Sequence, residues 1–177
     1  SAWRSCLCMG VKTTRRHEEA MRIKQFVKKL IGFTEISITG IDLEGAVVVV
    51  GVRPRQRAPR CGECGCKAPG YDCEEPRRWT HLAYGILRVV LVYACRRVDC
   101  PRCGVRVEQV PWAAHRSRFT RPFEELAAYH AQVTNRTAAS RLLGISWSTI
   151  GTIIGRVIRD RLDPGRFDGL RHIGVDE

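Results

Sequence analysis

The period of the hydrophobic positions changes along the chain. Over 18–32 apolar residues recur at helical spacing among lysines, which predicts a short amphipathic helix. Its apolar positions are Met21, Phe26, Leu30 and Ile31. Alternation over 33–39 and a valine-rich run over 46–52 then predict two strands joined by a turn at 42–45. The stretch 1–15 shows neither period and predicts no element.

A longer strand is predicted in the middle of the chain. From Gly85 the residues alternate between two faces as far as Cys95, and many on both faces are apolar. That pattern is typical of a largely buried strand. The segment 77–82 precedes it, and a turn at 83–85 would let the two pair as a hairpin.

The pattern then becomes helical. Thr120 is a candidate N-cap, and the glutamates that follow favour the positive end of a helix dipole, so a helix is expected to run to about Gln132. Its inward residues are Phe123, Leu126 and Ala127. A second helix over 137–143 stops at Gly144, which can adopt the left-handed conformation that ends helices. Ser146 caps a third helix. The apolar stripe of this helix comprises Ile150, Ile153, Ile154, Val157 and Ile158.

Two helices joined by a short turn that contains glycine, with arginines in the second helix, are typical of a helix-turn-helix. In that motif the N-terminal part of the second helix contacts DNA bases in the major groove. The residues expected to contact DNA there are Trp147, Ser148, Thr149, Thr152 and Arg156. Helical hairpins of this kind also occur in proteins that do not bind DNA, and Trp147 could equally pack against the first of the three helices.

The charge of the chain favours a polyanionic partner. Lys and Arg number 30 against 18 Asp and Glu, a formal net charge of +12, and nucleic acid is the commonest partner of such proteins. Two basic stretches, 53–60 and 116–121, read either as phosphate-contacting arms or as solvated linkers. Their candidate DNA-contacting residues are Arg53, Arg55, Arg57, Arg116 and Arg118.

No apolar run approaches the roughly 20 residues that cross a bilayer. A membrane-spanning protein is therefore excluded, and we expect a cytoplasmic protein associated with DNA. The odd number of cysteines, nine, and the lack of a secretory signal favour thiols over disulfides.

Two cysteine pairs have the spacing of zinc knuckles. Cys61 and Cys64 form the first pair, and Cys100 and Cys103 form the second. Four thiolates so arranged can close a tetrahedral site around Zn²⁺, and a site with four protein ligands is structural because it leaves no position for water. The 35 residues between the pairs exceed the usual interval of roughly 15 to 20, so this interval must fold back on itself.

The other cysteines are weaker candidates. Cys95 alternates with apolar residues of the long strand, so we expect it to be a small buried side chain. Cys66 and Cys73, with His81, are substitute ligands if the two pairs are not the true set. The remaining two, Cys6 and Cys8, have no recognisable partner and are expected to be free thiols.

The order of a four-cysteine finger, a helix-turn-helix and a closing Gly-Val-Asp-Glu resembles the N-terminal half of bacterial insertion-sequence transposases of the ISL-three type. The matching stretches are 52–64, 77–82, 96–105, 110–113, 143–150 and 174–177. In that family the finger and the helix-turn-helix bind the terminal inverted repeats of the element. A ribonuclease-H-like domain then cuts and joins strands with two aspartates and one glutamate.

The resemblance implies that Asp176 is the first carboxylate of that catalytic triad. Its partners are absent from this sequence, so we expect this chain not to be an enzyme, whereas its full-length parent would be a DDE transposase that uses Mg²⁺. The family usually begins nearer Met21, which leaves 1–20 unassigned.

We therefore expect an α+β chain. Its parts are an unassigned extension (1–20), a small N-terminal helix plus β-hairpin (21–56), a four-cysteine zinc-ribbon-like module (57–112), an all-α helix-turn-helix domain (117–163) and the start of a truncated catalytic domain (171–177). The predicted function is sequence-specific binding of double-stranded DNA at terminal inverted repeats, with a homodimer as one option. The alternatives are a zinc-stabilised protein-interaction or dimerisation module and a transcription regulator.

Overall fold

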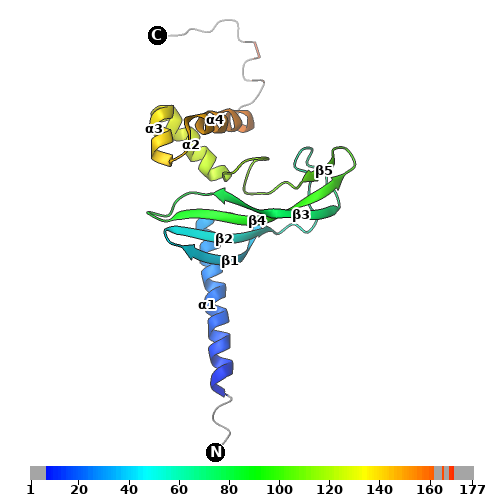
Figure 1. Ribbon diagram of the computed structural model, residues 1–177, viewed down its shortest axis with the longest axis vertical. Coiled ribbons are helices and arrows are strands. Elements are labelled where there is room, and N and C mark those ends of the chain that lie inside the picture. Colours follow the sequence, from blue (N-terminus) through cyan, green and yellow to red (C-terminus); the bar gives the residue numbers. More distant parts are fainter. Residues whose placement is uncertain (1–6, 162–164, 166–167, 170–177) are drawn as a thin grey trace, which may run out of the picture. The chain divides into compact units, whose positions relative to one another are not determined.

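The computed structural model describes residues 7–161, 165 and 168–169. The chain divides into two compact units, 1–121 and 122–177. In chain order the elements are α1 (Leu7–Ile31), β1 (Ile36–Glu44), β2 (Val47–Pro54), β3 (Gly70–Thr80), β4 (Arg88–Cys100), β5 (Gly104–Val107), α2 (Arg121–Val133), α3 (Arg136–Leu143) and α4 (Trp147–Arg161) (Figure 1). The α+β class is confirmed. None of the helices in the described ranges is long and apolar enough to cross a membrane.

The strand β4 lies in the middle of the sheet, whose order is β1-β2-β4-β3, and β5 pairs with the last residues of β4. The predicted hairpin is confirmed, because β3 and β4 are antiparallel with Trp79 opposite Leu91. Both strands are longer than expected, since β3 begins at Gly70 and β4 continues to Cys100. Apolar residues on both faces of β4 are buried, as a central strand requires.

The strand β2 joins the N-terminal segment to this hairpin. It pairs parallel with β4, so the segments 21–56 and 57–112 contribute to one sheet. The reversal between β1 and β2 occurs at Gly45, whose φ of 59° is the left-handed conformation that a tight hairpin turn favours. Asp42, which we placed in the turn, lies within β1 instead. Arg53 lies within β2, so the stretch 53–60 is not wholly a linker.

The helix α1 begins at Leu7, so the expectation that 1–15 forms no element is wrong. It ends at Ile31 as predicted, and Gly32 follows in the left-handed conformation. Ile31 is buried in the core and Val27 packs against it. Of the predicted apolar face, Met21 and Phe26 are exposed, because the packing of α1 on the core is made by residues nearer its end.

The segment 112–121 packs against the sheet. The buried ring of Trp112 makes edge-to-face contacts with Trp79 and Tyr93, with centroids 5.5 Å away in each case. The amide of Thr80 donates to the carbonyl of Arg118 (2.9 Å), and the amide of Thr120 donates to the carbonyl of Thr80 (3.0 Å). The basic stretch 116–121 is therefore not a solvated linker but is bonded to β3.

Thr120 is buried, and its hydroxyl lies 2.8 Å from Nδ1 of His81. The Thr120 hydroxyl, which we predicted to cap α2, therefore contacts His81. Burial lowers the pKa of His81 to about 4, so the imidazole is neutral at physiological pH.

The three remaining helices, α2, α3 and α4, each bury side chains. Asn135 caps α3 by accepting from the amide of Ala138 (2.8 Å), and Gly144 ends α3 with φ 63°. Ser146 accepts from the amide of Thr149 (3.2 Å), which confirms it as the cap of α4. The buried residues are Phe123, Glu124, Ala127, Ala139, Ile150 and Ile153. Leu126 and Ile158, which we expected to face inward, are exposed.

Candidate metal centre and nucleic-acid interface

The fold brings the two cysteine pairs together. The Sγ atoms of Cys61, Cys64, Cys100 and Cys103 all lie within 4.8 Å of one another. Cys100 is the last residue of β4 and pairs with Gly104, so the second knuckle is the turn between β4 and β5. The 35-residue interval between the pairs contains β3 and β4, and their antiparallel pairing folds the interval back so that the two pairs lie close together.

The thiol cluster has the dimensions of a zinc site. A tetrahedron with Zn–S bonds of about 2.3 Å has sulfur–sulfur edges of about 3.8 Å. The Sγ atoms of Cys64 and Cys100 are 3.5 Å apart. A hydrogen bond from the backbone of Arg102 lowers the pKa of Cys100 to about 7, whereas a hydrogen bond with Cys64 raises the pKa of Cys103 to about 12. The four residues present therefore fit Zn²⁺.

Polar contacts made by Gly62 and Glu63 hold the first knuckle in place. The amide of Gly62 donates to the carbonyl of Val107 (3.0 Å), just after the second knuckle. A Cβ at Gly62 would lie 2.4 Å from Nδ1 of His115 and 2.7 Å from the Val107 carbonyl oxygen, so only glycine fits. The Oε1 atom of Glu63 is 2.8 Å from Nη2 of Arg116 and 3.3 Å from Nε2 of His115. The knuckle is thereby attached to the segment 112–121.

The substitute ligands do not join this cluster. The carbonyl of Cys66 accepts from the amide of Cys61 (2.8 Å), Cys73 lies on β3 opposite Arg96, and His81 contacts Thr120. Cys95 is buried in the core as predicted, and burial raises its pKa to about 12. Of the other two cysteines, Cys6 and the side chain of Cys8 lie outside the described part of the chain.

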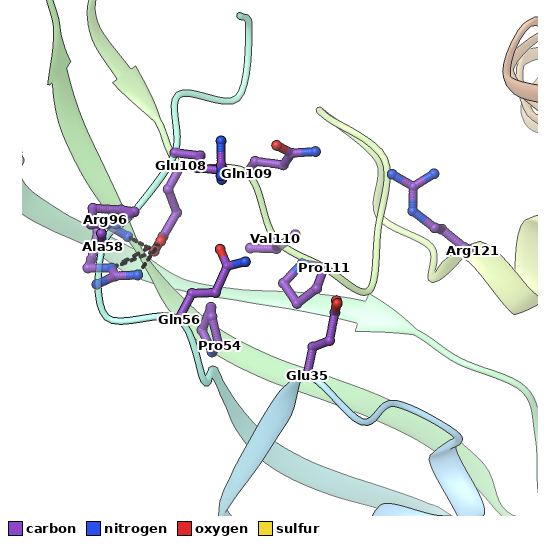
Figure 2. Close-up of a pocket in the computed structure, with 12 residues that line it drawn as sticks. Glu35, Pro54, Gln56, Ala58, Arg96, Glu108, Gln109, Val110, Pro111 and Arg121 are labelled. Atoms are coloured by element: carbon purple, nitrogen blue, oxygen red, sulfur yellow. Dashed lines mark hydrogen bonds and ion pairs between the residues drawn. The ribbon is translucent and has the colours of Figure 1, made fainter. Parts of the chain in front are cut away.

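A polar cavity of about 270 Å³ lies beside the 53–60 stretch, and Figure 2 shows the ion pair of Arg96 with Glu108 on its wall. Glu108 is buried, and its carboxylate accepts from Arg96 Nη2 (2.6 Å) and from the hydroxyl of Tyr93 (2.7 Å). Burial and this hydrogen bond raise the pKa of Tyr93. Arg96 also donates to the carbonyl of Arg57 (3.1 Å), so the network holds the basic stretch on the sheet.

The N-terminal end of α4 faces solvent. Trp147 is 54% exposed, and Ser148 and Thr152 are exposed as well. The guanidinium carbon of Arg136 lies 4.3 Å from the centre of the Trp147 ring, so this ring packs against α3. Thr149 is partly buried, with its hydroxyl 2.7 Å from that of Ser146 in the cap.

Arg156 is engaged with α2 and is largely shielded from solvent. Its guanidinium forms an ion pair with the buried Glu124 of α2, and its side chain is only 19% exposed. Arg159, by contrast, is exposed, and it follows the exposed Ser148 by 11 residues, close to three helical turns. Arg159 was not among the residues predicted to contact DNA, although its spacing from Ser148 indicates that both lie on one face of the helix.

The arginines of the two basic stretches are exposed. Arg53 is in β2, whereas Arg55, Arg57 and Arg118 lie in loops. Arg116 pairs with Glu63 but keeps 77% of its side chain exposed. These exposed guanidinium groups extend along the first unit and are available to phosphates.

Comparison with known proteins identifies part of the chain. Residues 108–158 match the helix-turn-helix domain of the transposase family ISL3. These residues are therefore similar to the helix-turn-helix domain of that family. The range includes α2, α3 and most of α4, so the motif predicted from the glycine turn is confirmed.

Curated relatives of the chain are also transposases. The chain is 42% identical over 139 residues to the transposase for insertion sequence element IS1557 of Mycobacterium tuberculosis, strain CDC 1551 / Oshkosh. The protein of the same description in strain ATCC 25618 / H37Rv gives the same identity over the same length. The resemblance to insertion-sequence transposases is confirmed.

The alignment covers 76% of this chain and 31% of each relative, so the chain spans about a third of the length of the curated relatives it matches. No solved structure matches the chain. Asp176, which the resemblance assigns to a catalytic triad, lies outside the described residues.

Proposed function

We propose that this chain binds double-stranded DNA at the terminal inverted repeats of an insertion sequence, as part of a transposase. The observation that carries the proposal is the exposed N-terminal end of α4 within an ISL3 helix-turn-helix. In such motifs that end of the second helix lies in the major groove. The transposase description of the relatives supports the ends of a mobile element as the site.

Within this proposal, α4 contributes both base and phosphate contacts. The hydroxyls of Ser148 and Thr152 and the indole of Trp147 are positioned to reach base edges or the adjacent backbone. Thr149 supports them through the helix cap. For Arg156 we propose a positioning role, in which its pair with Glu124 holds α4 on α2.

The proposed metal centre is a structural, zinc-ribbon-like module. Bound Zn²⁺ would cross-link the two knuckles and leave no coordination position for water, so metal-assisted hydrolysis is not expected at this ion. Strand cutting and joining, with Mg²⁺ and Asp176 as one carboxylate, is proposed only for a longer parent chain.

The proposal is tested by selecting bound duplexes from a random DNA pool and measuring affinity for the selected site against a scrambled duplex. Ser148→Ala with Thr152→Ala should lose about 1–3 kcal/mol of discrimination. Thr34→Ala, at an exposed position in the first unit, is the control for loss of a hydroxyl. Failure of the unaltered chain to prefer any sequence would refute sequence-specific binding.

A second candidate function is a zinc-stabilised dimerisation module. Exposed apolar residues on α2 and α4, including Tyr129 and Ile158, favour it. A salt titration separates the two functions. Binding through phosphates should weaken by about 0.9 log unit per contacted phosphate for each tenfold rise in salt, whereas an apolar dimer measured by sedimentation should respond little.

A further inference from the structure

A basic groove lies along the edge of β3, within the first unit. The strand β3 is the last in the sheet order, and the segment 116–120 runs beside it through the bridge of Thr80 with Phe119. The groove has a volume of about 610 Å³ and is lined by both segments. Its four charged lining residues are all arginines, Arg77, Arg78, Arg116 and Arg118. We call this site the β3-edge groove.

The arginines of the β3-edge groove are available to a ligand. The side chains of Arg77 and Arg78 are 48% and 55% exposed. Each pairs with an exposed or half-buried carboxylate, Glu74 at 3.4 Å and Glu44 at 3.0 Å. Surface pairs of this kind contribute little to stability, so a phosphate can replace the carboxylate at small cost.

The backbone at Arg116 is an independent observation at the same place. Its φ of 61° makes it the one residue other than glycine with a positive φ in the described part of the chain. That conformation favours glycine, and side chains held in it against their preference are concentrated at functional sites. Here the side chain so placed is a cation on the wall of the β3-edge groove.

We infer that the β3-edge groove binds the phosphodiester backbone of duplex DNA. The inference rests on the proposed function, and it assigns to the first unit a contact that does not depend on sequence. Guanidinium groups suit phosphate oxygens, and the groove presents no exposed aromatic platform for unpaired bases, since Trp79 is buried and Phe119 is partly buried.

Edge protection is the competing role for these residues. Arginine and proline on an exposed strand prevent pairing with another sheet, and Pro76 lies beside Arg77. A purely protective role requires no DNA contact. The two roles therefore differ in the salt dependence of DNA binding.

The test is fluorescence anisotropy over a salt series, with a duplex carrying the selected site and a scrambled duplex. The double variant Arg77→Gln with Arg118→Gln should weaken binding to both duplexes by the same factor. It should also reduce the slope of log affinity against log salt by about 2. Arg88→Gln with Arg106→Gln removes equal charge from exposed positions outside the groove and is the control. A slope equal to that of the control would overturn the inference. Aggregation of the variant would indicate only that the arginines protect the strand edge.

Arg116→Gly is a second variant that protects the test from misfolding, because glycine accepts a φ of 61° without strain. The variant loses the pair with Glu63, but the Arg116 side chain is 77% exposed and surface pairs contribute little to stability, so the melting temperature should change little. The slope should fall by about 1, and an unchanged slope would overturn the inference. A larger loss on a single-stranded oligonucleotide than on the duplex would overturn the assignment to duplex DNA.

The outcome also separates this inference from the proposed function. If the unaltered chain discriminates between duplexes while the groove variants keep the control slope, only the β3-edge groove is refuted. If the unaltered chain binds neither duplex, both ideas fail.

Discussion

Replacing Arg156 with alanine should destabilise the helical unit. The change removes the partner of Glu124, whose side chain is only 4% exposed. Breaking a buried ion pair by deleting one partner costs about 3–5 kcal/mol, and the 19% exposure of Arg156 places the expected loss near the lower end, at about 3 kcal/mol.

That loss is large compared with the stability of so small a unit. About 40 residues at about 0.05–0.15 kcal/mol each give a total free energy of unfolding of about 2–6 kcal/mol. Since each kcal/mol shifts the melting temperature of a small domain by about 4–8 °C, Arg156→Ala should lower it by at least about 12 °C. Thermal melting followed by far-ultraviolet circular dichroism measures this shift.

A double variant separates packing from DNA contact. Glu124→Met with Arg156→Met removes both charges at similar volume, and such exchanges of buried pairs are often neutral. If Arg156 only positions α4, this variant should melt near the unaltered protein and bind DNA with an unchanged salt slope. A slope lower by about 1 on every duplex would show that Arg156 contacts phosphate.

The reasoning is refuted if Arg156→Ala melts within a degree or so of the unaltered chain. The ion pair with Glu124 would then contribute nothing to the packing of α4, and the positioning role would be lost with it.

Three further predictions concern the first unit. Removing zinc with a chelator, or Cys61→Ser, should unfold the knuckles and weaken binding without changing the preferred sequence; metal analysis that finds no zinc in purified protein would contradict this. Gly62→Ala should lower stability by about 1–3 kcal/mol in denaturant unfolding because its Cβ meets His115, whereas Gly70→Ala, with nothing within 4 Å of its Cβ, should not. The lowered pKa of His81, about 4, makes its contribution to stability present above about pH 6.5 and lost as the pH falls towards 4, by up to about 1.4 kcal/mol per pH unit. In thermal melts between about pH 7 and 5, His81→Gln should lose less stability than the unaltered chain as the pH falls. Equal losses in the two proteins would exclude a contribution of His81 to the pH dependence.

Local patterns were enough for much of the fold and for the metal ligands. The knuckle spacing selected the four cysteines that the fold brings together, because two residues between cysteines can direct both sulfurs to one point. The caps at Ser146 and Gly144 marked the helix ends, since capping depends on residues within one turn. The hairpin of β3 and β4 followed from alternation and a nearby turn.

Tertiary structure decided what depends on residues distant in sequence. The parallel pairing of β2 with β4 and the bonding of 116–120 to β3 join segments far apart along the chain, and no local period encodes such pairs. The two arginines of α4 differ for the same reason. Glu124 on another helix draws Arg156 inward and leaves Arg159 exposed, because a helical period defines faces but only the packed neighbour determines which face is covered.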